Sequence, residues 1–81
     1  MYYVYILKCS DNSYYVGITW NLEKRLKEHN TENKCLFTKS RRPVKLIHSE
    51  SYKDKSAAAK REKELKGWSR KKKEKLINSL H

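Results

Sequence analysis

Two short runs of aromatic and β-branched residues at the N-terminus most constrain the fold of this chain. Residues 2–9 (YYVYILKC) are nearly all apolar and are typical of a largely buried strand, and residues 14–19 (YYVGIT) are typical of a second strand. Turn-forming residues at 10–13 separate them, so the pattern predicts a β-hairpin. Each run carries a tyrosine triplet, Tyr3-Val4-Tyr5 in the first and Tyr15-Val16-Gly17 in the second.

The rest of the chain predicts one more strand and three helices. Asn21 can cap a helix over 22–30, residues 31–42 lack a clean period and predict a loop, and Pro43 precedes a strand over 44–48. Asp54 or Ser56 can cap a helix over 57–66 that ends at Gly67, and Ser69 can cap a third through 78. The order β-β-α-β-α-α predicts one α+β domain over residues 1–81, an antiparallel sheet with helices packed on it.

Composition favours a polyanionic partner. The 81 residues carry 20 Lys and Arg against 9 Asp and Glu, a net charge of +11, and nucleic acid is the commonest partner for such an excess. A membrane is not expected, because no apolar run approaches the ~20 residues of a span and no basic segment has a broad apolar face. Cys9 and Cys35 lack metal-site spacing and predict free thiols in a reducing cytoplasm.

The predicted first helix turns two unusual residues toward the sheet. At about 100° per residue, Leu22, Leu26 and His29 share one arc, with Arg25 at its edge. A charged arginine beside a core needs a partner, which is either a structural salt bridge or a phosphate. His29 is either a packed histidine or part of a site with Arg25, because residues four apart on a helix are neighbours.

Glu62 is the acidic residue that the second helix turns inward. It lies ~50° from the apolar face marked by Ala58 and Leu65. A lone inward carboxylate among many cations suits a hard divalent metal such as Mg²⁺. The alternative is an ordinary ion pair with Lys66 or Arg61.

The length of the hairpin loop decides whether Tyr5 and Tyr15 lie on the same face of the sheet. Tyr5 and Tyr15 share a sheet face only if the hairpin pairs residues of equal parity. A two-residue loop at 11–12 would place them on opposite faces. A shared tyrosine site therefore predicts an odd loop length or a bulge.

A basic segment follows the second helix. Residues 60–75 hold nine Lys or Arg and three Glu, and Trp68 lies among them. Such a run is either a solvated face or a surface that binds phosphates (a footprint). The net positive charge of the whole chain favours the footprint. The residues expected to contact nucleic acid there are Lys66, Trp68, Arg70, Lys71 and Lys72, with Arg41 and Arg42 from the preceding loop.

In this order and spacing, the motifs resemble the GIY-YIG nuclease superfamily. The chain looks like the small stand-alone members, which are similar to the N-terminal endonuclease domain of the bacterial excinuclease C subunit. The matching segments span roughly residues 2–78: the two tyrosine triplets, the NLEKRL run at 21–26, the RRP turn at 41–43 and the AKRE run at 59–62. Tyr3 stands where the pattern has glycine, which is expected to narrow the groove.

The resemblance implies a three-stranded antiparallel sheet flanked by helices. It also implies hydrolysis of DNA phosphodiesters assisted by one divalent metal, Mg²⁺ or Mn²⁺. By position, the catalytic residues are Tyr5, Tyr15, Arg25, His29 and Glu62, with Glu62 as the metal ligand. Gly17 would allow close backbone approach to the nucleic acid.

Three functions fit these features. The first is a metal-dependent DNA endonuclease, in repair or recombination. The second is a nucleic-acid-binding module that keeps the nuclease fold with little turnover. The third is an adaptor that docks on a repair complex, although no apolar patch for a protein partner is evident in the sequence.

Overall fold

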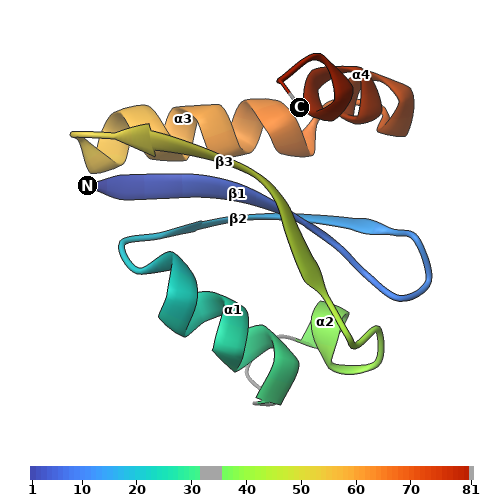
Figure 1. Ribbon diagram of the computed structural model, residues 1–81. Helices are drawn as coiled ribbons and strands as arrows, with labels where there is room; N and C mark the ends of the chain where they lie inside the picture. The colour runs from blue at the N-terminus through green and yellow to red at the C-terminus, as the bar shows by residue number, and fades with distance from the viewer. Residues whose placement is uncertain (32–35, 81) are drawn as a thin grey trace.

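A three-stranded antiparallel sheet lies between two layers of helices in the computed structural model, which describes residues 1–31 and 36–80 (Figure 1). The strands are β1 (Tyr2–Lys8), β2 (Tyr14–Thr19) and β3 (Lys45–Tyr52), in the order β2-β1-β3. One face is covered by α1 (Leu22–Thr31) and the single turn α2 (Leu36–Lys39), and the other by α3 (Lys55–Lys66) and α4 (Arg70–Leu80). The predicted α+β fold class and element order are confirmed, with α2 added.

The apolar character of β1 follows from its central place in the sheet. Four consecutive residues, Val4 to Leu7, are buried because helices cover both faces of this strand. Val4 and Ile6 pack with α3, in a cluster that contains Val16, Ala58 and Leu65. Tyr5 and Leu7 belong to the opposite cluster, with Cys9 and Val44, against which Leu22 and Leu26 of α1 pack.

A bulge bends the edge strand β3. Ile6 pairs with His48 but Leu7 pairs with Leu46, so Ile47 is an extra residue on β3. Figure 1 shows β3 curving across the sheet. The predicted strand over 44–48 was too short: β3 continues to Tyr52, because the polar stretch after His48 alternates between solvent and partners on α3.

Several predicted boundaries need correction. Part of the loop expected over 31–42 is helical, since α2 brings Thr38 against α1; residues 32–35 lie outside the described chain. α3 starts at Lys55 rather than 57, and its N-cap Asp54 makes no side-chain capping bond. Asn21 and Ser69 do cap, accepting from the backbone N–H groups of Lys24 at 3.1 Å and Lys72 at 3.3 Å.

The structure bears on the cysteine and membrane predictions only over the described residues. Cys9 is buried just after β1, whereas Cys35 lies outside the described residues. Over residues 1–31 and 36–80, no helix is long and apolar enough to cross a membrane.

Candidate functional site

The hairpin turn places Tyr5 and Tyr15 on the same face of the sheet. The Cys9 N–H donates to the Ser13 carbonyl at 2.9 Å, which closes a three-residue loop whose last residue, Asn12, has φ 69°. Residues of equal parity therefore pair: Tyr5 lies opposite Gly17, and Leu7 opposite Tyr15. The two tyrosine ring centroids are 6.4 Å apart. The predicted odd loop length is confirmed.

Gly17 is required by the tyrosine opposite it. A Cβ built on Gly17 would lie 2.3 Å from the Tyr5 hydroxyl oxygen, far inside contact distance. The absence of a side chain lets the phenol ring of Tyr5 lie across the backbone of β2. Tyr5 fills the space beside Gly17, which does not support close approach of nucleic acid there. The expected contact of Gly17 with nucleic acid stays a prediction.

His29 joins both tyrosines from α1. Its Nε2 lies 2.9 Å from the Tyr5 hydroxyl, and its Nδ1 lies 2.9 Å from the Thr38 hydroxyl. Its ring centroid is 5.0 Å from that of Tyr15, nearly edge to face. A neutral imidazole has one N–H, so His29 donates to one of these hydroxyls and accepts from the other.

The surroundings of His29 keep its ring neutral. The side chain is buried, and burial lowers the pKa of His29 below its ordinary value of 6.5. The positive charge of Arg25 lowers it further, and the partial opposing effect of Glu28 does not reverse the shift. The neutral ring can accept a hydrogen bond from one of the two hydroxyls, and its lowered pKa makes His29 a weak proton acceptor.

Arg25 lies at the rim of this cluster, as the helical spacing predicted. Its side chain is 43% exposed, and its Nε is 3.7 Å from a carboxylate oxygen of Glu28. A pair this long and this exposed contributes little to stability. The guanidinium can therefore exchange Glu28 for a phosphate oxygen.

Glu62 comes from the opposite layer. It belongs to α3, which packs on the face with Val4 and Val16, and a carboxylate oxygen lies 3.4 Å from Lys66 Nζ. The structure thus brings Tyr5, Tyr15 and His29 together, with Arg25 beside them, and leaves Glu62 across the sheet. α3 approaches α1 at its start, where Lys55 and Arg25 line one hollow at the end of β2.

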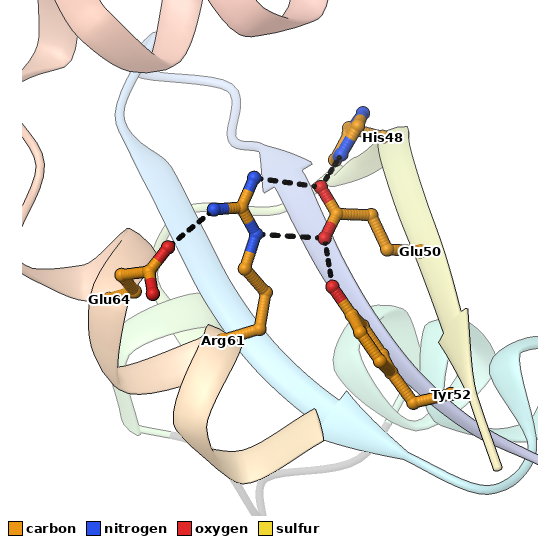
Figure 2. A network of polar contacts seen from close by, with 5 residues as sticks. All are labelled: His48, Glu50, Tyr52, Arg61 and Glu64. Carbon is orange, nitrogen blue, oxygen red and sulfur yellow. Dashed lines mark hydrogen bonds and ion pairs between the residues drawn. The ribbon is translucent and has the colours of Figure 1, made fainter. Parts of the chain in front are cut away.

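A polar network fixes α3 against β3 (Figure 2). Arg61 Nε donates to Glu50 at 2.9 Å and its NH1 to Glu64 at 2.6 Å. Glu50 also contacts His48 Nε2 at 2.8 Å and accepts from the Tyr52 hydroxyl at 2.7 Å. Burial alone would raise the pKa of Glu50, but these hydrogen bonds lower it to about 2. Arg61 thus pairs with Glu50, which leaves the next residue, Glu62, on another side of the helix.

Most residues of the expected nucleic-acid footprint have partners within the protein. Arg41 pairs with Asp11 at 3.0 Å, and Arg42 donates to the His29 carbonyl at 2.8 Å. Arg70 pairs with Glu74 at 2.9 Å and lies over the Tyr14 ring. Lys72 and Arg61 lie over the Trp68 ring, at 4.3 and 5.0 Å from its centroid, whereas Lys71 is exposed. Binding of nucleic acid would compete with these contacts.

Two residues with structural roles, Thr38 and Glu50, were not found from the sequence, and the role predicted for a third, Arg42, differs from the contact it makes. Thr38 holds His29 from α2, a turn too short to show a period. Glu50 orients Arg61, but it lies in a polar stretch that carried no strand signal. Arg42 supports the backbone of α1, where a basic residue was expected to contact phosphate. Only the alternation of β3 could have suggested Glu50.

The residues present allow a metal only of a particular kind. Among the described residues, no group of three or more His, Cys, Asp or Glu side chains could hold an ion. Glu62 offers one carboxylate, and Mg²⁺ is often held by one or two carboxylates together with waters and substrate phosphates. This donor set fits an ion shared with a substrate and does not fit a metal enclosed by protein.

Comparisons with known proteins identify the family and support the fold. The family model of the GIY-YIG catalytic domain matches residues 1–75. UPF0213 proteins of Staphylococcus haemolyticus and Natronomonas pharaonis are 49% and 46% identical over 76 residues, which is 94% of this chain and 93% and 89% of theirs. The solution structure of a protein from E. faecalis is 40% identical, with a TM-score of 0.67 over 99% of this chain and 85% of that one. The chain therefore belongs to the GIY-YIG catalytic domain family, among the small UPF0213 relatives.

Proposed function

We propose that this protein is a nuclease that hydrolyses DNA phosphodiester bonds with one divalent ion, Mg²⁺ or Mn²⁺. The cluster of Tyr5, Tyr15 and His29 beside the exposed Arg25 carries the proposal. It gathers, on one face of the sheet, groups that can move a proton and a cation that can hold a phosphate. A role in DNA repair or recombination in the cytoplasm belongs to the same proposal and rests on family resemblance.

The two tyrosines differ in access to solvent. Tyr5 is 2% exposed and is hydrogen-bonded to His29, whereas Tyr15 is half-buried. We propose that the hydroxyl of Tyr15 takes the proton of the attacking water. Tyr5 and His29 hold the Tyr15 ring in position and form its polar surroundings. A tyrosine base needs positive charge nearby, since the ordinary pKa of the phenol is ~10. Arg25 and the basic chain supply it.

Arg25 and Glu62 complete the proposed site. Arg25 binds a non-bridging oxygen of the scissile phosphate, where it offsets the charge that grows during attack. Glu62 would hold the metal, which when bound acts as a Lewis acid for the leaving oxygen. Glu62 lies seven residues along α3 from Lys55, or about 10 Å. A substrate must therefore reach α1 and α3 together along the edge of β2.

A nucleic-acid-binding module with little turnover is the second candidate. The burial of Tyr5 and the pairing of Glu62 with Lys66 favour it, because both groups are already engaged inside the protein. The basic charge fits both functions equally.

Cleavage assays with two site variants and one control variant separate these functions. Plasmid, branched and single-stranded DNA are incubated with Mg²⁺ or Mn²⁺, and DNA binding is measured in parallel. Arg25→Ala and Glu62→Gln are expected to lower the cleavage rate at least ~100-fold while binding is retained. Glu64→Gln is the matched control, since it removes a carboxylate from the exposed side of the same helix. Cleavage that survives both substitutions would place the reaction elsewhere, and wild-type binding without cleavage would favour the module.

A further inference from the structure

Trp20 is the most exposed large apolar side chain of the described residues. It is 70% exposed, directly after β2, and among those residues it makes no ring or cation contact. The ring of Trp68, by contrast, is in contact with the side chains of Arg61 and Lys72. A single exposed aromatic residue needs no explanation by itself. The residues around Trp20 are what indicate a function for it.

Trp20 borders three hollows, two of which it shares with Arg25. One is lined by Thr19, Lys24 and Glu28 as well as Arg25, and another by Tyr2, Ile18 and Lys55 as well as Arg25. The third adds Tyr3 and Glu23. The indole thus lies among cationic side chains and next to the residue that is proposed to hold the scissile phosphate.

An exposed indole among lysines and an arginine suits a nucleic-acid strand better than a protein partner. Sites for single strands combine a basic groove for the backbone with an aromatic ring on which a base stacks. A paired base offers no free face for stacking inside a duplex, so the ring selects unpaired bases. A protein partner would favour a contiguous apolar patch, and the residues around Trp20 are mostly charged or polar.

We propose that Trp20 stacks on an unpaired nucleobase next to the phosphate held by Arg25, so that the preferred substrates are single-stranded or branched. The inference rests on the proposed function only for the role of Arg25. Tyr3, which replaces the glycine of the family pattern, lines one wall beside Trp20. Tyr3 thereby adds a second aromatic side chain beside Trp20, in the hollow that Arg25 does not line.

The test measures binding of a dT oligonucleotide and of a duplex of equal length to the full chain. Trp20→Ala is expected to weaken binding of the single strand roughly tenfold and to change duplex binding less than about twofold. Trp20→Phe keeps a ring and should recover most of the loss. An oligouridine of the same length shows whether RNA is bound with the same preference.

Tryptophan fluorescence gives an independent readout, because the chain has only two tryptophans. The dT oligonucleotide should quench the wild-type emission, and the quenching should be lost in Trp20→Phe and kept in Trp68→Phe. If Trp68→Phe does not fold, comparison of the wild type with Trp20→Phe decides. Equal losses on single strand and duplex, or quenching that survives Trp20→Phe, would overturn the stacking role.

The outcome is separable from that of the proposed function. Cleavage that depends on Arg25 but shows the same strand preference in Trp20→Ala would leave the nuclease standing and remove this inference. Quenching by the dT oligonucleotide in a protein that never cleaves DNA would support the stacking role of Trp20 and contradict the nuclease.

Discussion

At the scale of single residues, Gly17 is a packing requirement imposed by Tyr5. The Tyr5 ring cannot move aside freely, because it is 2% exposed and bonded to His29. A methyl group 2.3 Å from its hydroxyl must therefore displace the ring and break that bond. Gly17→Ala is expected to lower the free energy of unfolding by about 1–3 kcal/mol, which thermal denaturation would show as a lower Tm.

Gly67→Ala is the matched control for that substitution. Its Cβ would meet no atom closer than 3.5 Å, and its φ of −82° is open to any residue. It should change the stability by less than about 1 kcal/mol, in either direction. Equal losses at both glycines would show that the contact with Tyr5 is not the cause.

Residue-scale prediction from the sequence succeeded where a periodic element set the direction of a side chain. The helical spacing turned His29 inward and left Arg25 at the rim, and the structure confirms both. The same spacing turned Glu62 partly inward, where it is 21% exposed. Which face of the sheet each helix covers cannot be read from the spacing, so the separation of Glu62 from His29 could not be foreseen.

At the scale of elements, the Glu50–Arg61 pair is a polar contact that joins α3 to β3, beside the apolar packing of Ala58 and Leu65. Both side chains are only about a fifth exposed, at 19% and 22%. The hydrogen bonds lower the pKa of Glu50 from 4.5 to about 2 against the effect of burial. A lowered carboxyl pKa means stability that is present above pH 4.5 and is lost as the pH falls through about 2.

Glu50→Gln is therefore expected to destabilise the protein by about 2–3 kcal/mol at pH 7. The difference from the wild type should stay constant down to about pH 5 and disappear near pH 2. Denaturant unfolding across this pH range measures it. Glu64→Gln removes the other carboxylate on Arg61, but that one is 50% exposed and should cost less than about 1 kcal/mol. A pH-independent loss in Glu50→Gln would point to packing instead of charge.

The elements themselves were largely predictable, and the exceptions share a cause. The hairpin, α1, α3 and α4 have strong periodic or turn signals in the sequence. The end of β3 and the turn α2 do not, because their stability comes from tertiary contacts. Glu50 is held by Arg61, and Thr38 by His29, across 11 and 9 residues. Local propensity does not record such partners.

At the scale of the whole molecule, the edge of β2 connects the features that bear on function. Trp20 and Arg25 lie at the C-terminal end of β2, and Arg70 lies over Tyr14 at the other end. The six residues of β2 span about 20 Å. α3 runs beside it, from Lys55 near Thr19 toward α4. A nucleic-acid backbone laid along this edge would meet the candidate site and the basic segment in turn.

The size and charge of the molecule predict a definite dependence of duplex binding on salt. Its longest extent is 29 Å, which is about eight base pairs of duplex at 3.4 Å each. If about five phosphates are neutralised, a plot of log K against log salt concentration has a slope of about −4.5.

Lys71→Gln with Lys72→Gln should make the slope shallower by about 1 to 2. Lys27→Gln with Lys45→Gln removes the same charge from exposed positions outside the basic segment, and Lys45 lies on the other edge strand, β3. If both pairs change the slope equally, the net charge of +11 acts diffusely and α4 is no footprint. A change confined to the α4 pair would place the duplex along that end of β2.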